Sequence, residues 1–202
     1  MTNTHASTDS AEHARKMAEM QAEMRKRTAA ARDKKGLLMV HTGNGKGKST
    51  AALGMLVRSL SHGKRCGVMQ FIKSAPDRAE RVLRGDLLTW KAVGDGFTWN
   101  TQDRDADIAR CREGWDLVKR WLADPEVKFI WLDELNVVLA YEYLPLDEVM
   151  AALAARVEGQ HVVVTGRGAP ESLIEASDLT TEMREVKHPF KAGIQAQAGI
   201  EF

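Results

Sequence analysis

The sequence has few cysteines, little net charge and no long apolar run, and each of these absences excludes a class of protein. Its two cysteines, Cys66 and Cys111, fit neither a disulfide framework nor a Cys-x-x-Cys zinc site. The formal net charge of +1 lacks the basic excess of a nucleic-acid-binding protein. No apolar run approaches the roughly 20 residues of a membrane-spanning helix, and residues 1–10 do not resemble a secretory signal. We therefore expect a cytoplasmic protein that binds neither nucleic acid nor membranes.

The chain of 202 residues, 44% of them hydrophobic, is long enough for one well-filled core. Residues 1–35 are expected to form an N-terminal helical arm, and residues 36–202 the folded domain. Methionines recur at helical spacing in the arm, whose helix is expected over residues 11–32. The arm is interpreted either as a solvated helix, which is marginal in isolation, or as a lid over a large ligand or over a neighbouring subunit's site.

A glycine-rich loop lies between an apolar strand, expected at residues 37–40, and a helix, expected at residues 48–60. The loop residues are Thr42, Gly43, Asn44, Gly45, Lys46, Gly47, Lys48, Ser49 and Thr50. Glycines let backbone N–H groups turn toward an anion, Lys48 adds a positive charge, and the Ser49 hydroxyl can reach Mg²⁺. Thr42 stands where the usual phosphate-loop pattern has its first glycine, so Gly43 and Gly45 are expected to provide the turn. The loop predicts binding of a nucleoside triphosphate.

Strands and helices alternate along the rest of the chain. Further strands are expected at residues 66–72, 87–93, 129–132, 161–165 and 179–186, and helices around residues 108–122, 146–157 and 170–176. This alternation, with continuous apolar strands and without internal repeats, predicts an α/β fold with a mostly parallel sheet covered by helices on both faces. Ligands of such sheets bind at the carboxyl ends of the strands. The segments there, residues 42–50, 70–73, 94–99, 133–134 and 165–168, are expected to converge on one cleft.

Asp133 and Glu134 directly follow the apolar residues 129–132. Four apolar residues and an acid form the pattern that places a carboxylate beside the loop serine and its Mg²⁺. An acidic pair after a strand can also be a helix N-terminus favoured by the helix dipole. The phosphate loop favours the metal-binding interpretation.

Other polar and aromatic residues at the strand ends allow two interpretations. Phe97 and Trp99, in a glycine-containing segment, are either buried satellites of the core or ligand contacts. Lys73 and Arg167 either meet phosphates or carboxylates, or are solvated. The histidines that we interpret as structural, because they lack metal-ligand spacing, are His41, His62, His161 and His188.

Several strings of residues, in this order, resemble the ATP:corrinoid adenosyltransferases of cobalamin synthesis and salvage. They are Thr42-Gly43-Asn44-Gly45-Lys46-Gly47-Lys48, Gln70-Phe71-Ile72-Lys73, Gly96-Phe97-Thr98-Trp99, Leu132-Asp133-Glu134-Leu135, Ala140-Tyr141-Glu142-Tyr143-Leu144-Pro145-Leu146, Thr165-Gly166-Arg167-Gly168 and Val186-Lys187-His188. The resemblance runs from about residue 36 to residue 202. It implies a P-loop fold related to recombination ATPases and a homodimer that transfers the 5′-deoxyadenosyl group of ATP to the cobalt of a reduced corrinoid, releasing triphosphate.

The resemblance also implies roles for the nucleotide-binding residues. Residues 43–48 would hold the triphosphate of ATP, while Ser49 and Glu134 bind Mg²⁺ with Asp133 in support. The nucleotide would lie in the direction opposite to that in ordinary P-loop enzymes, so that the ribose C5′ faces the corrinoid. The family usually has threonine at the position of Ser49, and serine keeps the hydroxyl.

On the corrinoid side, Phe97 and Trp99 match the aromatic residues that close the lower face of the corrin ring. With Lys48 they are the predicted catalytic residues, and an electron donor such as a reduced flavoprotein is implied. Because Co(I) is itself a strong nucleophile, the absence of a catalytic triad agrees with this reaction. The alternatives are a P-loop kinase or ATPase, and a nucleotide-switched binding protein.

Overall fold

The structure, a computed structural model, describes residues 5–73, 82–83, 85–94 and 103–200 and divides the chain into two units, Met1–Lys34 and Lys35–Phe202. The first unit contains helix α1 (His5–Ala30), which begins six residues earlier than the helix expected from residue 11. The described side chains of α1 are exposed, and ion pairs such as Lys16–Glu12 at 2.9 Å join successive turns. Such pairs between successive turns stabilise a helix modestly, by about 0.2–0.5 kcal/mol each.

The second unit is built on a six-stranded parallel sheet with the order β3-β2-β4-β5-β1-β6. The strands are β1 (Leu38–Thr42), β2 (Arg65–Gln70), β3 (Leu88–Ala92), β4 (Val127–Asp133), β5 (His161–Thr165) and β6 (Leu179–Glu182). All side chains of β1 are buried, whereas those of the edge strand β6 are exposed. The α/β fold class predicted from the sequence is confirmed.

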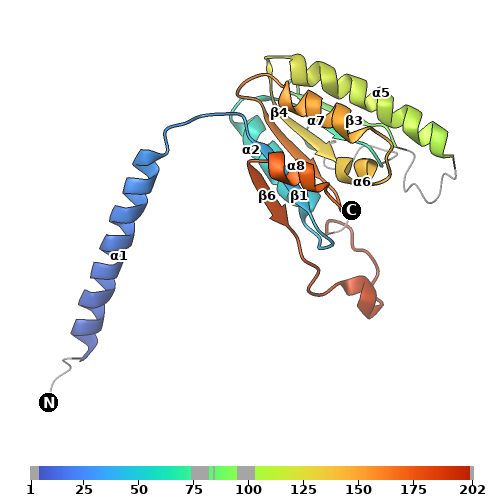
Figure 1. The fold of residues 1–202 in the computed structure, drawn as a ribbon. Coiled ribbons are helices and arrows are strands. Elements are labelled where there is room, and N and C mark those ends of the chain that lie inside the picture. Colours follow the sequence, from blue (N-terminus) through green and yellow to red (C-terminus); the bar gives the residue numbers. More distant parts are fainter. Residues whose placement is uncertain (1–4, 74–81, 84, 95–102, 201–202) are drawn as a thin grey trace. The chain divides into compact units, whose positions relative to one another are not determined.

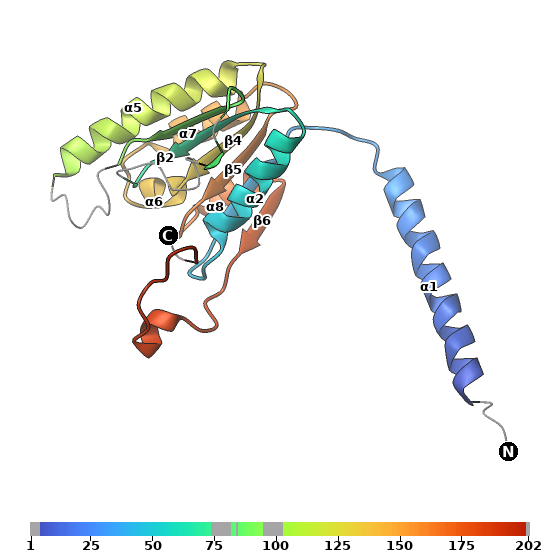
Figure 2. The same cartoon turned by 180° about the vertical axis from the view of Figure 1, so that it is seen from behind.

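Helices cover both faces of the sheet (Figures 1 and 2). Helix α2 (Lys48–Ser61) packs on one face. On the other face lie α5 (Arg104–Ala123), α6 (Leu135–Ala140), α7 (Leu146–Ala154) and α8 (Glu171–Ala176), and a short 3-10 helix, η1 (Pro189–Ala192), follows β6. None of the helices in the described part of the chain is long and apolar enough to span a membrane.

Strand β4 shows how the two faces are filled. Its side chains alternate, so that Phe129 and Trp131 pack on the α2 side while Ile130 and Leu132 pack on the side of α5. All four are buried. Burying one such side chain contributes about 2 kcal/mol to folding. These two clusters hold the central strands rigidly, and with them the loops at their carboxyl ends.

The structure differs from the predicted elements at specific ends. Helix α5 begins at Arg104 because the Asp103 carboxylate accepts a hydrogen bond from the Ala106 N–H at 3.1 Å, which caps the helix. Strand β6 ends at Glu182 rather than residue 186 because Met183 turns onto the phosphate loop. Helix α7 ends at Ala154 rather than residue 157, and the short helix α6 was not predicted.

Candidate active site

The phosphate loop follows β1 and leads into α2. Gly43 (φ 91°) and Gly47 (φ 111°) adopt left-handed conformations that favour glycine. A Cβ on Gly43 would lie 2.5 Å from the Met183 carbonyl oxygen, so the segment after β6 packs directly against the loop. Met183 also fixes the loop by backbone hydrogen bonds, donating to the Thr42 carbonyl (2.8 Å) and accepting from the Gly45 N–H (2.6 Å).

Lys48 lies inside this loop. It is buried, and its Nζ donates to the carbonyl oxygens of Gly43 and Gly45, each at 2.7 Å. Burial lowers the pKa of Lys48, and the negative charge of Glu134 opposes that effect. The two carbonyl contacts therefore hold the ammonium group in a position to form an ion pair with an anion bound in the loop.

The other predicted loop residues differ in exposure. Thr42 is buried, and its hydroxyl accepts a hydrogen bond from the Ala169 N–H at 3.2 Å. Asn44, Lys46 and Thr50 are exposed. The structure thus brings the predicted residues 42–50 together as one loop, with Thr42 fixing its start.

Asp133 is the point at which several elements meet. Its Oδ1 accepts hydrogen bonds from the hydroxyls of Ser49 and Thr165, both at 2.8 Å. Its Oδ2 accepts from the side-chain amide of Gln70 at 3.1 Å and lies 3.6 Å from Lys73 Nζ. Donors from α2, β5 and β2 therefore hold this carboxylate, which is 1% exposed, in one orientation.

Glu134 adopts a left-handed backbone conformation (φ 61°), which typically costs a residue other than glycine about 1 kcal/mol or more. Its N–H donates to the Thr165 hydroxyl at 3.3 Å, which helps to hold this conformation. Burial, followed by the neighbouring Asp133, raises the pKa of Glu134, while Lys48 and Arg167 lower it. Arg167, ambiguous from the sequence, thus lies within electrostatic reach of both Glu134 and Lys48.

The oxygen atoms gathered here suit a magnesium ion. Mg²⁺ is usually bound by one or two carboxylates together with phosphate oxygens and water. Ser49, Asp133 and Glu134 offer such atoms. In the described residues no group of three or more His, Cys, Asp or Glu side chains is placed to hold a metal ion. Gly166 leaves room at this point, because a Cβ there would lie 3.1 Å from Glu134 Oε2.

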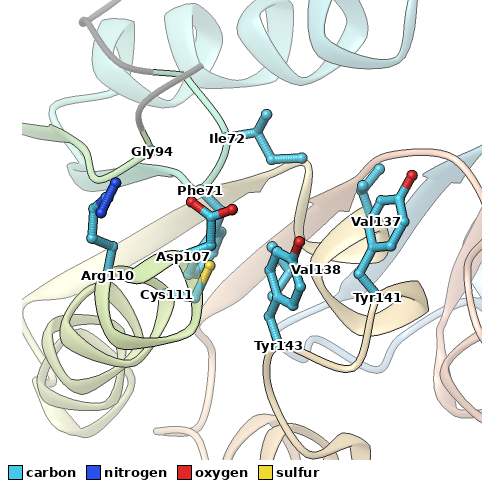
Figure 3. A pocket seen from close by; sticks show the side chains of 10 residues that line it. All are labelled: Phe71, Ile72, Gly94, Asp107, Arg110, Cys111, Val137, Val138, Tyr141 and Tyr143. Carbon is cyan, nitrogen blue, oxygen red and sulfur yellow. The ribbon is translucent and has the colours of Figure 1, made fainter. Parts of the chain in front are cut away.

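A pocket opens beside the carboxyl end of β2 (Figure 3). Asp107 and Cys111 of α5 lie on one side of it, and Tyr141 and Tyr143 on the other. The two tyrosine rings are stacked, with centroids 5.8 Å apart and an angle of 28° between their planes. Gly94 also lines the pocket. The pocket thus combines aromatic and apolar surface with a few polar groups.

Phe97 and Trp99 lie outside the residues that the structure describes, in the segment of residues 95–102. Gly94, which precedes this segment, lines the pocket. Arg104, which follows it closely, has its guanidinium carbon 5.8 Å from the centroid of the Tyr143 ring. The chain on either side of the two aromatic residues is therefore anchored near the pocket.

A second, polar groove adjoins the phosphate loop at Asn44. Asn44 of the loop and the cationic residues Arg167, Arg184 and Lys191 line it, together with Glu182 and Glu185. Lys191 and Glu185 form an ion pair within the groove. Three cationic residues and two carboxylates line it, which leaves a small positive charge that favours an anionic ligand.

The histidines mostly contact the backbone. His41 is buried with its Nδ1 3.3 Å from the Lys48 carbonyl oxygen, and the Nδ1 of His161 accepts from the Leu37 N–H at 3.1 Å. His188 caps η1 by accepting from the Phe190 N–H. These contacts support the structural interpretation of the three residues.

Sequence reasoning placed Gln70 and Thr165 at the strand ends but assigned neither a role. Both are fully buried polar residues that hydrogen bond to Asp133. Trp90 and Asn136 were not singled out, although Asn136 donates to the Gly166 carbonyl at 3.0 Å beside the acidic pair. The sequence signal for Gln70 and Thr165 is that each is a polar residue at the end of an apolar strand. Their shared partner, Asp133, lies on another strand, so the sequence does not show the contact.

Comparison with known proteins gives consistent matches. A family model described as ATP:corrinoid adenosyltransferase BtuR/CobO/CobP matches residues 34–202. A corrinoid adenosyltransferase of Pseudomonas aeruginosa is 49% identical over 193 residues, which cover 94% of this chain and 95% of that protein. One from Sinorhizobium is 46% identical over 202 residues, 98% of this chain and 94% of the relative. One from Escherichia coli is 47% identical over 177 residues, 87% and 90% of the two chains.

Proposed function

This chain belongs to the ATP:corrinoid adenosyltransferase family BtuR/CobO/CobP, and we propose that it transfers the 5′-deoxyadenosyl group of ATP to the Co(I) centre of a reduced corrinoid in adenosylcobalamin biosynthesis or salvage. Triphosphate is the second product. The reaction would take place in the cytoplasm, which agrees with the two free, buried cysteines of the chain.

The observation that carries this proposal is the junction between the phosphate loop and the acidic pair. Ser49, the second residue of α2, hydrogen bonds at 2.8 Å to Asp133 at the end of β4. The hydroxyl and the carboxylate therefore lie at the same point, beside the loop that would hold the triphosphate. Bound to Ser49 and Glu134, with Asp133 in support, Mg²⁺ would neutralise charge on the departing triphosphate.

The loop would grip the part of ATP that leaves. Its backbone N–H groups and Lys48 would hold the triphosphate, and the cationic groove lined by Arg167 and Arg184 offers further positive charge next to it. We propose that the nucleotide lies in the direction opposite to that in ordinary P-loop enzymes. The ribose C5′ would then face away from the loop and toward the corrinoid.

The corrinoid would approach from the side of the pocket between α5 and Tyr141. Phe97 and Trp99 follow Gly94, which lines this pocket, in the sequence, and we propose that they close the lower face of the corrin ring. Removing the lower axial ligand of Co(II) makes its reduction easier, and an electron donor such as a reduced flavoprotein would then supply one electron. The active form would be a homodimer.

The transfer of the adenosyl group needs no general base from the protein. The electron pair of Co(I) attacks C5′ and forms the Co–C bond, while the bond between C5′ and the triphosphate oxygen breaks and its electrons leave with triphosphate. Cobalt is formally oxidised to Co(III). The protein must align the three reacting atoms and stabilise the leaving charge, which preorganised groups such as Lys48 can do.

The decisive experiment incubates the protein with ATP, Mg²⁺ and chemically reduced Co(I) cobalamin. We expect the light-sensitive spectrum of a Co–C bond and one triphosphate per adenosylated corrinoid, measured by phosphorus NMR. Lys48→Ala should lower kcat/KM by at least about a hundredfold, corresponding to a few kcal/mol. The matched control is Lys128→Ala, an exposed lysine of β4, which should not change the rate.

The main alternative is a P-loop kinase or ATPase, which would use the same loop for γ-phosphoryl transfer. The same experiment separates the two, because a kinase or ATPase forms ADP rather than triphosphate. A nucleotide-switched binding protein would form neither product at a useful rate. ADP as the main product, without a Co–C spectrum, would refute the proposed function.

A further inference from the structure

A short chain of buried polar side chains leads from the edge strand β3 to the acidic pair. The indole Nε1 of Trp90 donates to Gln70 Oε1 at 2.9 Å, and Gln70 Nε2 donates to Asp133 Oδ2 at 3.1 Å. Gln70 is 0% exposed and Trp90 6% exposed. Burying a side-chain amide costs desolvation free energy unless its oxygen and its NH₂ group both form hydrogen bonds. In Gln70 both groups have partners.

The chemistry of the three groups fixes the direction of this chain. An indole can only donate a hydrogen bond, and an ionised carboxylate can only accept one. The amide of Gln70 lies between them, so its oxygen must face Trp90 and its NH₂ must face Asp133. The indole N–H thus favours the orientation in which the amide presents its donor, rather than its oxygen, to the carboxylate.

We propose that Trp90 and Gln70 are positioning residues that fix the orientation of the Asp133 carboxylate, and that they thereby set the metal affinity of the site. Gln70 and Lys73 engage Oδ2, which leaves Oδ1 for the Ser49 and Thr165 hydroxyls. If the carboxylate rotated, the Ser49 hydroxyl would lose the hydrogen bond that holds it where it can bind a metal ion. The inference rests on the proposed function only in taking Ser49 and the acidic pair as the Mg²⁺ site.

The chain offers a matched pair of variants. Trp90→Phe removes an indole N–H that hydrogen bonds to Gln70. Trp115→Phe removes another buried indole, 1% exposed, whose Nε1 has no hydrogen-bond partner in the described part of the structure. Both changes leave a cavity of similar size, and only the first breaks the chain to Asp133.

The measurement is metal affinity rather than turnover. Mn²⁺ binding in the presence of ATP is followed by electron paramagnetic resonance, and ATP binding without metal by calorimetry. We expect Trp90→Phe to weaken Mn²⁺ binding about tenfold, the low end of what losing a direct partner of a metal ligand costs, because Trp90 acts through Gln70 and Asp133; metal-free ATP binding should stay unchanged. Trp115→Phe should stay within about twofold of the wild type, and urea unfolding shows that each variant is folded.

A double variant tests whether the two residues act as one unit. Gln70→Met should weaken Mn²⁺ binding at least as much as Trp90→Phe, and adding Trp90→Phe to it should cause no further loss. Equal effects of the two tryptophan variants, or losses that multiply in the double variant, would overturn the proposal. If Trp90→Phe does not fold, Gln70→Met against Trp115→Phe gives the same comparison. No corrinoid enters these assays, so their result is independent of adenosyl transfer.

Discussion

Thr165 makes three hydrogen bonds that bear on the acidic pair. Its hydroxyl donates to Asp133 Oδ1, and it accepts from the Trp131 indole at 3.2 Å and from the Glu134 N–H at 3.3 Å. Thr165→Val keeps the shape but leaves buried donors unsatisfied, so we expect a loss of about 2 kcal/mol in the free energy of unfolding and weaker Mg²⁺ binding. Thr165→Ser keeps the hydroxyl, so it should retain most of the stability and most of the Mg²⁺ affinity of the wild type.

Urea unfolding gives the stability of these two variants, and calorimetry gives their Mg²⁺ affinity in the presence of ATP. The serine variant serves as the reference for packing, because it loses a methyl group while it keeps every hydrogen bond. A valine variant as stable and as tight for Mg²⁺ as the wild type would show that the hydroxyl does not support the acidic pair.

The proposed role of Phe97 and Trp99 predicts a difference between two starting states of cobalt. If they exclude the lower axial ligand, Phe97→Ala or Trp99→Ala should slow adenosylation that starts from Co(II) at least about tenfold more than adenosylation from pre-reduced Co(I). Rates of Co–C bond formation under anaerobic conditions measure both. Equal losses from the two states would contradict the role and would point to a general effect on corrinoid binding.

How far the sequence predicted the site depends on how local each signal is. The phosphate loop and the pair Asp133–Glu134 were predicted because their spacing along the chain carries the chemistry. Thr165 and Gln70 acquire their roles only through a carboxylate on the neighbouring strand β4. That relation depends on strand order and register, which residue spacing does not encode.

Among the elements, helix α6 ends in a conformation that costs stability. The Glu142 N–H donates to the Leu139 carbonyl and the Tyr143 N–H to the Val138 carbonyl, each at 3.0 Å, which is a Schellman motif. Glu142 occupies its left-handed position (φ 56°) and is exposed. Glu142→Gly should therefore raise the free energy of unfolding by about 1 kcal/mol, measured by urea unfolding.

A control separates this backbone effect from the loss of a charge. Glu142→Gln removes the charge but keeps the Cβ, so it should leave the stability nearly unchanged. Stabilisation by glutamine equal to that by glycine would assign the effect to electrostatics instead of to backbone strain.

The start of β1 depends on Asp178, and this contact predicts a pH dependence. The Asp178 carboxylate pairs with Lys35 and accepts from the Leu38 N–H at 2.9 Å; these bonds, that with Lys35 first, lower its pKa. The unfolded chain then binds the proton more tightly, so the stabilisation is complete above the ordinary pKa of aspartate and is lost as pH falls through the lowered value.

Asp178→Asn should therefore reduce the stability at pH 7, by less than about 1 kcal/mol because the pair is near the surface, and the difference should vanish in strong acid. Urea unfolding of both proteins from neutral pH down into strong acid measures it. Glu175→Gln, at an exposed position on α8, is the control for loss of one negative charge. A difference that does not change over this range would show that the carboxylate charge has no part in it.

Among the strands, the prediction was most accurate for one that is buried on both faces of the sheet. The run 161–165 was predicted with the bounds of β5, because every central strand of a parallel sheet is apolar. Helix α6 has only six residues, too few to show a helical period. Strand β6 ends before Met183, whose N–H still donates to Thr42 of β1 while its carbonyl accepts from the Gly45 N–H of the phosphate loop, and no local sequence pattern predicts that contact.

At the scale of the whole molecule, the hydrophobic clusters of the described residues lie in the unit Lys35–Phe202. The described side chains of α1 are exposed, among them Met17, Met20 and Met24. Deleting residues 1–34 should therefore leave the stability of the remaining unit to urea unchanged, within about 0.5 kcal/mol. The predicted lid would be lost, so adenosyl transfer should slow.

A full-length variant with Met17, Met20 and Met24 replaced by serine tests the lid without shortening the chain. If the arm is a lid, this variant should slow transfer like the deletion, because the methionines by which a lid would dock are gone. Full activity in both proteins would leave α1 without a role in the reaction, and a lower urea midpoint after deletion would show that the arm supports the fold.

The parallel sheet has a practical consequence for attaching the protein to probes or surfaces. Its site loops gather at one edge, and the exposed turn containing Glu158 precedes β5 at the other. Burial raises the pKa of both native thiols, Cys66 and Cys111, to about 12, so neither reacts readily with maleimides. A single cysteine introduced at Glu158 would thus carry a fluorophore, or a tether to a sensor chip, with the catalytic edge facing free solution.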